Sequence, residues 1–201
     1  MKLYYSPGAC SLSPHIALHE IGAKFDLAKV DTKSKRLDDN RDFREVNPYG
    51  YVPALELDSG EILLEGPAIV QYIADLNPEA GIAPVNGSLE RVRVQSALAL
   101  INSEIHKAIG ALFNPNLDDD GKASAINKVE ARLDVLDRQF GDAQYIANDR
   151  YSVADAYLFV VMRWLKFFRI GLDRWPALAR HHALIAQRPA VQAALAEEGL
   201  G

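Results

Sequence analysis

The stretch KLYYSPGACSLSPHIALHEIG, residues 2–22, decides the fold prediction. Its first four residues, Lys2 to Tyr5, are β-prone and run directly into a cluster of turn-forming residues. Ser11 to Ile21 then place apolar side chains at helical spacing, and Gly22 suits the end of a helix. The stretch therefore predicts a strand, a tight turn and a helix in that order.

The segments that follow extend this unit into an α/β domain. Phe25 to Val30 predict a second strand, which should be parallel to the first because a helix connects the two. The charged residues 31–44 indicate a loop or an irregular helix. Pro53 to Leu57 and Glu61 to Leu64 predict a hairpin around a glycine-containing turn, and a helix from Gly66 to Leu76 follows it. This order of strands and helices is that of a thioredoxin-like domain.

The remainder of the chain is expected to be an all-α helical bundle. Turn-forming residues crowd positions 78–87, which we interpret as a linker between a thioredoxin-like domain at 1–77 and a helical domain at 88–201. Ser152 and Asp155 have the spacing of a capping box at a helix start. Apolar residues at helical spacing predict helices over residues 94–112, 126–140, 153–168, 175–187 and 189–197.

Composition limits the classes of function. The 201 residues are 49% hydrophobic with a net charge of −5, and their basic side chains are scattered, so we expect no nucleic-acid partner. The longest apolar run, Ala156 to Met162, is far short of the roughly 20 residues that cross a bilayer, and no secretory leader is evident, so we expect a cytoplasmic protein without a membrane partner. The single cysteine, Cys10, excludes an internal disulfide and a multi-cysteine metal site, and we expect no metal.

Cys10 is the leading candidate for chemistry. It lies between the tight turn and the expected helix start, where the helix dipole and unpaired N–H groups favour a thiolate. This turn belongs to the edge of the sheet at which open α/β folds usually bind ligands. The alternative is a cysteine that fills a small apolar gap. Ser11 is a weaker candidate, with a role as N-cap as its alternative.

The segment NPYGYVPAL, residues 47–55, resembles the N-P-x-G-x-V-P signature of glutathione transferases. In that family the last proline, here Pro53, follows a cis peptide bond. The resemblance implies that the backbone of Val52 pairs with the cysteinyl backbone of glutathione like an added β-strand. Without the resemblance, Pro53 would be read as the start of an edge strand.

The segment LEGPAIVQYI, residues 64–73, strengthens the resemblance. It implies that Glu65 binds the α-ammonium of the glutamyl end of glutathione, while free N–H groups at the helix start bind the glutamyl carboxylate. Many relatives have serine where this chain has Gly66, so the hydroxyl contact is absent here and the backbone N–H serves alone. The alternative is that Glu65 simply complements the helix dipole.

The segment EIHK, residues 104–107, resembles a beta-class motif in which a helix brings a histidine and a lysine onto the cysteine. The resemblance implies that His106 hydrogen-bonds the sulfur of glutathione and that Lys107 lowers the thiol pKa. Considered alone, His106 would be read as a solvated side chain on a polar helical strip. The resemblance assigns further glutathione contacts to Tyr5, Lys35, Tyr51 and Ser103. Tyr5 is also a rival for thiol activation, since other classes use a tyrosine or a serine there.

The resemblance to bacterial beta-class glutathione transferases spans the whole chain. It implies a homodimeric detoxification enzyme that conjugates glutathione, as co-substrate, to a small apolar electrophile in the groove between its domains. Two alternatives remain open. One is glutathione-dependent disulfide reduction or reductive dehalogenation through a Cys10 mixed disulfide, and the other is non-catalytic binding of glutathione or apolar ligands. Phe113, Trp164 and Phe168 are candidates for contacting the electrophile, although core packing explains them equally well.

Overall fold

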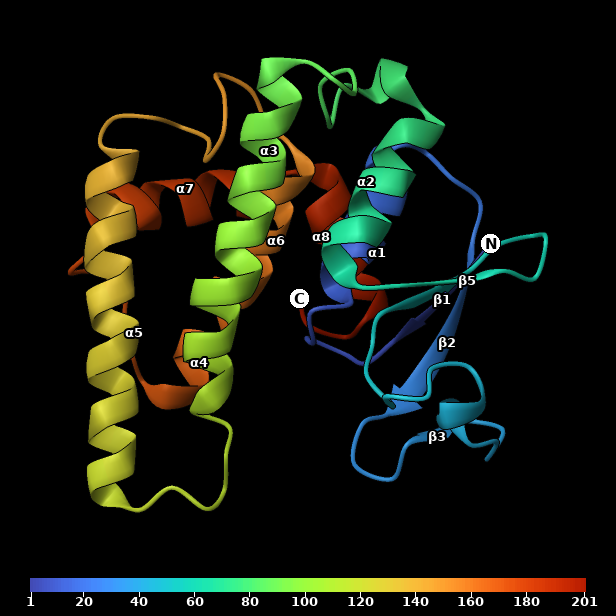
Figure 1. Cartoon of the computed structure of the whole chain (residues 1–201), viewed down its shortest axis with the longest axis horizontal. Coiled ribbons are helices and arrows are strands. Elements are labelled where there is room, and N and C mark those ends of the chain that lie inside the picture. The colour runs from blue at the N-terminus through green and yellow to red at the C-terminus, as the bar shows by residue number, and fades with distance from the viewer. The chain divides into compact units, whose positions relative to one another are not determined.

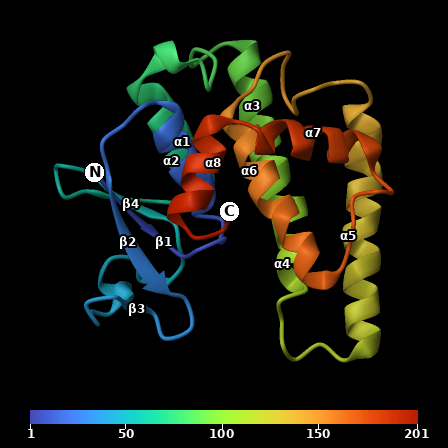
Figure 2. The same cartoon turned by 180° about the vertical axis from the view of Figure 1, so that it is seen from behind.

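The computed structural model describes residues 1–201, and they form two compact units. Unit 1 comprises residues 1–84 together with 188–201. Unit 2 comprises residues 85–187. Figures 1 and 2 label the main helices and strands, and each unit is described by itself.

Unit 1 contains a five-stranded mixed sheet with the strand order β3-β2-β1-β4-β5. The central strand β1 (Lys2–Tyr5) pairs parallel with β2 (Asp26–Asp31), as the sequence predicts, and antiparallel with β4 (Ala54–Glu56). The edges are β5 (Ile62–Leu64) and the short strand β3 (Arg36–Leu37), which the sequence did not reveal. The arrangement confirms the thioredoxin-like fold.

Two helices, α1 (Leu12–Glu20) and α2 (Gly66–Leu76), lie side by side in unit 1 (Figures 1 and 2). Short 3-10 helices, η1 (Phe43–Glu45) and η2 (Pro78–Ala80), complete the unit. Apolar side chains at helical spacing on both long helices are fully buried, which is why these segments form and pack: Leu12, Ile16, Ile69 and Ile73.

The last helix, α8 (Pro189–Glu197), belongs to unit 1, which corrects the expected helical domain at 88–201. It packs against α1, and the guanidinium of Arg188 donates two hydrogen bonds to the Glu20 carboxylate, at 2.6 and 2.9 Å. Its apolar residues Val191, Ala194 and Leu195 are buried. Periodicity in the sequence shows that this segment is a helix, but it does not show which unit the helix packs against.

Unit 2 is helical throughout. Its longer helices are α3 (Leu89–Leu100), α5 (Asp119–Phe140), α6 (Val153–Met162) and α7 (Pro176–Ala186). Every residue of α6 is buried, which makes it the core helix of this unit, as its nearly continuous apolar sequence indicates. No helix of the chain is both long enough and apolar enough to cross a membrane.

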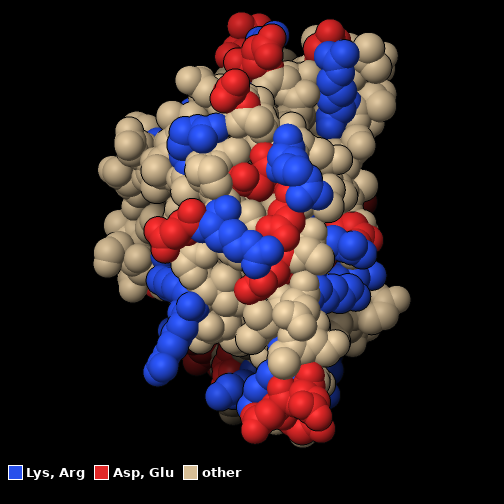
Figure 3. All heavy atoms as spheres, turned by 90° about the vertical axis from the view of Figure 1, so that its left-hand side faces the viewer, with Lys and Arg blue, Asp and Glu red and all other residues tan.

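On the face of unit 2 that α5 forms, acidic and basic side chains are interspersed (Figure 3). Ion pairs connect several of them, including Arg132 with Glu104 at 2.7 Å and Arg174 with Asp134 at 2.6 Å. These pairs are partly exposed, so each contributes little to stability. The mixture of signs leaves no strip of a single charge on this face.

The segment expected to be one helix over 94–112 is interrupted. After α3, residues Ile101–His106 form a π-helical turn, η3, and Lys107–Ala111 continue as α4. Similarly, the helix expected over 153–168 ends at Met162, and Arg163–Phe168 form a 3-10 helix, η4. Side-chain spacing predicts a helix but does not distinguish i+4 from i+3 or i+5 hydrogen bonding, and π-helical turns are frequent at functional sites.

The capping box at the start of α6 is confirmed, and its carboxylate, that of Asp155, also binds groups outside the capping box. The Asp155 carboxylate accepts from the Ser152 N–H at 2.8 Å and the Ile146 N–H at 2.8 Å, and it lies 3.0 Å from Nε2 of His181. Asp155 is fully buried. One carboxylate therefore joins the start of α6, the preceding loop and α7.

We predict that Asp155→Asn lowers the free energy of unfolding by about 3 kcal/mol, because a buried acceptor becomes an amide donor facing other donors. The matched control is Asp118→Asn at the exposed N-cap of α5, where Asp118 accepts from the Gly121 N–H. Asparagine caps as well as aspartate, so this control should lose less than about 0.5 kcal/mol. Urea unfolding measures both losses, and equal losses would contradict the central role of Asp155.

Candidate active site

Cys10 lies in the turn immediately before α1, and its sulfur contacts the segment that carries the family-like signature. The thiol donates to the carbonyl oxygen of Val52, with 3.2 Å between Sγ and O. The Val52–Pro53 peptide bond is cis, as the resemblance implies. The N–H of Val52 makes no hydrogen bond within the chain. Residues far apart in sequence thus meet where the central strand β1 ends and β4 begins.

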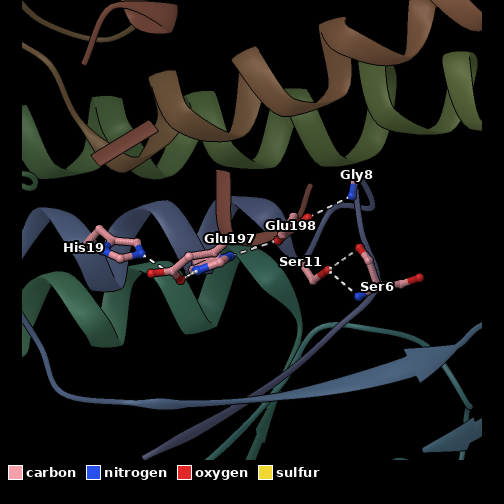
Figure 4. Close-up of polar contacts among 7 residues, drawn as sticks. Ser6, Gly8, Ser11, His19, Glu197 and Glu198 are labelled. Carbon is pink, nitrogen blue, oxygen red and sulfur yellow. Dashed lines mark hydrogen bonds and ion pairs between the residues drawn. The ribbon is translucent and has the colours of Figure 1, made fainter. Parts of the chain in front are cut away.

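Partly buried hydrogen bonds hold the loop that carries Cys10 in place. The Ser11 hydroxyl accepts from the Ser6 N–H at 3.1 Å and donates to the Ser6 carbonyl at 3.3 Å. The N–H of Gly8 donates to Oε2 of Glu198 at 2.8 Å (Figure 4). Ser11 is fully buried and its side chain makes no capping bond to α1. Its hydroxyl therefore holds the loop, which differs from both the ligand contact and the N-cap considered from the sequence.

The ionisation of Cys10 differs from the sequence-based expectation. Burial raises the pKa of the Cys10 thiol to about 11, although the backbone N–H groups of Cys10 and Ser11 act in the opposite direction. The carboxylate of Glu65 adds to the increase. The partial loss of water around the sulfur outweighs the helix N-terminus, so the direction of this pKa is opposite to the readily formed thiolate expected from the sequence. At neutral pH the side chain is a thiol that donates to Val52.

Tyr5, the rival for thiol activation, is buried beside α1. Its ring centroid lies 6.2 Å from that of His15. Burial raises the pKa of Tyr5, and the nearby carboxylate of Glu198 raises it further. The phenol stays neutral at neutral pH, so the electrostatics of unit 1 do not favour Tyr5 as a base.

Glu65 is exposed at the N-terminus of α2, and its carboxylate makes no capping hydrogen bond to that helix. Its backbone has φ 68° and ψ 108°, a conformation that costs a non-glycine residue on the order of 1–3 kcal/mol and is found mostly at ligand sites. The next residue, Gly66, has room for a side chain, because a Cβ there would lie 3.7 Å from Pro53. A free carboxylate and free helix N–H groups therefore lie on adjacent residues.

Lys35 reaches the same signature segment from the loop after β2. Its ammonium donates to the carbonyl of Gly50 at 2.9 Å and lies 5.1 Å from the ring centroid of Tyr51. Tyr51 is 68% exposed, so this cation and ring are open to solvent. The structure thus places Lys35, Tyr51 and Val52 together, as expected from the sequence.

In unit 2, His106 is held by a chain of hydrogen bonds. Its Nδ1 lies 2.6 Å from the Tyr157 hydroxyl, which donates to Oδ1 of Asn102 at 2.9 Å. Because the single hydroxyl proton points to Asn102, Nδ1 of His106 carries a proton and donates to Tyr157. Burial lowers the pKa of His106 to about 4, so the ring is neutral at neutral pH. Its Nε2 is therefore left as a hydrogen-bond acceptor.

Ser103 and Lys107 are exposed on the same helix, and neither takes part in this chain of hydrogen bonds. The sequence did not identify Tyr157 as a functional residue. Because α6 is apolar on all sides, its sequence predicts only that Tyr157 packs in the core. A tyrosine hydroxyl in such a helix needs a buried hydrogen-bond partner, and this need was the sequence signal that could have identified Tyr157.

An aromatic cluster adjoins His106. The ring centroid of Trp164 lies 4.8 Å from that of His106, and Phe113 contacts Trp164 and Phe168.

The chain matches two family models and several known proteins. Residues 8–76 match the family model of the glutathione S-transferase N-terminal domain, and residues 100–189 match that of the C-terminal domain. The chain is 42% identical to glutathione S-transferase GstA of Escherichia coli O157:H7 over the full length of both. A sphingomonad glutathione S-transferase complexed with glutathione superposes over all of both chains, with TM-score 0.96 and 50% identity. A beta-class glutathione S-transferase of Sphingomonas chungbukensis superposes with TM-score 0.97 and is 49% identical, also over all of both chains.

We predict that iodoacetamide alkylates Cys10 of the ligand-free protein slowly at pH 7, and that the rate rises about tenfold per pH unit towards pH 11. The thiolate is the reactive form, and its population increases until the pH reaches the pKa. Mass spectrometry reports this residue alone, because the chain has no other cysteine. Urea-unfolded protein is the control and should react faster near pH 8. A rate that levels off below pH 8 in the folded protein would contradict the buried-thiol assignment.

Proposed function

The chain belongs to the glutathione S-transferase family, and on this premise we propose that it conjugates the glutathione thiol to small hydrophobic electrophiles. The observation that carries the proposal is the meeting of Cys10 with the cis Val52–Pro53 segment in unit 1. The sphingomonad enzyme whose structure contains glutathione is 50% identical over the whole chain. Glutathione acts as co-substrate, and its sulfur is the nucleophile.

Unit 1 offers a partner for each part of glutathione. The unpaired N–H of Val52 suits the cysteinyl carbonyl, in the manner of an added strand. The exposed Glu65 carboxylate suits the glutamyl ammonium, and the N-terminus of α2 at Gly66 suits the glutamyl carboxylate. Lys35 and Tyr51 supply a cation and a ring suited to the glycyl end. We assign glutathione recognition to these five residues.

The two groups that we propose for the chemistry, Cys10 in unit 1 and His106 in unit 2, are both neutral at neutral pH. In the structure the Cys10 thiol donates to the Val52 carbonyl, and by turning this one proton to the glutathione thiolate it would stabilise that thiolate without having to ionise itself. His106 is neutral with Nε2 free to accept, so it suits the proton that glutathione loses. The glutathione sulfur then forms its bond to the electrophile, and the leaving group departs with its electron pair. Lys107 contributes positive charge from the exposed side of its helix, and Ser103 lies on the same polar strip.

The aromatic cluster next to His106 supports an apolar electrophile. Phe113 is half exposed, and its ring contacts Trp164, Phe167 and Phe168 at centroid distances between 4.7 and 6.0 Å. Trp164 in turn packs edge-on against His106. An aryl or alkyl electrophile lying on these rings would bury apolar surface next to the group that accepts the proton.

We further propose a cytoplasmic homodimer that serves detoxification. The dimer is supported by a hollow on unit 2, between the α3–η3 segment and α5, which is lined by Leu100, Ile105, Val135 and Leu136 and by the polar residues Glu104, Arg132 and Gln139. Leu100 and Val135 are more than one third exposed, which is unusual for aliphatic side chains that face each other across a hollow.

We predict that Cys10→Ala retains conjugation of a simple aryl halide to within about tenfold, because it removes one donor and leaves the nucleophile intact. The same variant should lose any reduction of glutathionyl disulfides, which needs the Cys10 sulfur to form a mixed disulfide. Steady-state assays with both substrates measure the two activities. Wild-type protein that binds glutathione without turning over either substrate would instead indicate the non-catalytic alternative. Complete loss of both activities in the variant would make Cys10 the obligatory nucleophile.

We predict that Tyr157→Phe lowers kcat for conjugation about tenfold while the KM for glutathione changes little. Without the hydroxyl, Nδ1 of His106 loses its acceptor, so Nε2 no longer stays free of a proton. The control is Tyr145→Phe in the same unit, whose ring contacts Tyr151 and lies outside the His106 hydrogen bonds. Unchanged kcat in Tyr157→Phe, with native circular dichroism, would contradict the assignment of His106 as proton acceptor.

A further inference from the structure

A second cluster of ionisable side chains lies in unit 1, outside the residues assigned to glutathione. His15 and His19 are four residues apart on α1, so they lie on one face of the helix a single turn apart. Glu197, the last residue of α8, points at both rings. Figure 4 shows Glu197 beside His19 and Glu198 beside the loop that carries Gly8. We refer to His15, His19 and Glu197 as the His–His–Glu cluster.

The three side chains converge on a single point. Oε2 of Glu197 lies 2.8 Å from Nε2 of His15 and 3.2 Å from Nε2 of His19. One ligand atom from each residue lies within 4.8 Å of the other two. Ligand atoms bound to one tetrahedral Zn²⁺ at about 2.0–2.1 Å are separated by about 3.3 Å. Only small side-chain adjustments are therefore needed to place the three atoms around one ion.

The rings are held in place by contacts behind them, as in established zinc sites. Nδ1 of His15 lies 2.9 Å from Oε1 of Glu198, and both side chains are fully buried. A carboxylate on the far nitrogen fixes the ring and makes the coordinating nitrogen a better ligand. Phe25 packs edge-on against both imidazoles, at 5.5 and 5.2 Å between ring centroids. The cluster is thus already arranged before any ion binds.

The cluster also has access to solvent. His15 is buried, whereas the side chains of His19 and Glu197 are 22% and 45% exposed. Both line a surface hollow together with Phe25, Lys24 and Asp26. An ion can therefore enter from this side and keep water as its remaining ligand. The charge of Lys24 opposes a cation there, and the carboxylates of Asp26, Glu197 and Glu198 favour one.

We propose that the His–His–Glu cluster is a binding site for a divalent transition metal ion, with Zn²⁺ as the ion it fits best. Two imidazole nitrogens and one carboxylate oxygen with an open fourth position match the preferences of zinc, whereas Ca²⁺ and Mg²⁺ prefer all-oxygen sites. The ion takes the place of the proton between Nε2 of His15 and Glu197. It joins α1 to α8, and through Glu198 it is linked to the Gly8 N–H in the loop of Cys10. No metal was expected from the sequence, but a single cysteine excludes only multi-cysteine sites and does not bear on a site of two imidazoles and a carboxylate.

The test is a Zn²⁺ titration by calorimetry at neutral pH, using the full chain without a histidine tag after removal of metal with a chelator. We expect one equivalent to bind, and we expect His19→Gln and Glu197→Gln each to weaken binding at least about 100-fold. Both positions are at the surface, so the variants should fold, and circular dichroism checks this. The matched controls are His182→Gln in unit 2 and Glu61→Gln in unit 1, which should bind like the wild type.

Cys10 is the competing ligand, and Co²⁺ separates the two sites. Co²⁺ in the His–His–Glu cluster should show visible bands of four-coordinate cobalt without a sulfur-to-metal charge-transfer band, and Cys10→Ala should keep the spectrum. The ion should also raise the melting temperature of the wild type but not that of Glu197→Gln. A wild type that binds no Zn²⁺, or binding that His19→Gln and Glu197→Gln leave unchanged, would overturn the proposal.

Discussion

The hydrogen bonds that fix residues Ser6 to Ser11 are the constraint on which the architecture of unit 1 depends. Val52 accepts from the Cys10 thiol, Glu198 accepts from the Gly8 N–H, and Ser11 closes the loop on itself through Ser6. These contacts come from the residues that follow β1, from the segment before β4 and from the residue that follows α8. A loop held in this way is a rigid support for a ligand, although loops are usually the mobile part of a fold.

The acid–base character of the molecule follows from burial. The pKa of Cys10 is raised and that of His106 is lowered because both groups are partly removed from water. In each unit, the group proposed for the chemistry therefore carries no charge of its own at neutral pH. The hydrogen bonds of Cys10 with Val52 and of His106 with Tyr157 already orient these two groups.

Much of the fold could be predicted from local sequence, and less of the site. The strand, turn and helix at residues 2–22, the parallel pairing of β1 with β2 and the capping box at Asp155 follow from short-range patterns. The packing of α8 on α1 and the π-helical turn at 101–106 do not, because they depend on tertiary contacts and backbone hydrogen bonding. Cys10 stood out by its position, but its pKa depends on burial, and the Tyr157 contact depends on packing between helices.

Unit 1 is assembled from two separate parts of the chain, because α8 packs with residues 1–84, and this affects how the protein folds during synthesis. Ribosomes make a chain from its N-terminus, and domains usually fold as they emerge. Residues 85–187 form one contiguous unit, so they can pack as soon as they leave the exit tunnel. The first part of unit 1 is made before unit 2, yet it lacks residues 188–201 until unit 2 has been made. Nascent α1 therefore exposes the surface that α8 covers throughout the synthesis of residues 85–187.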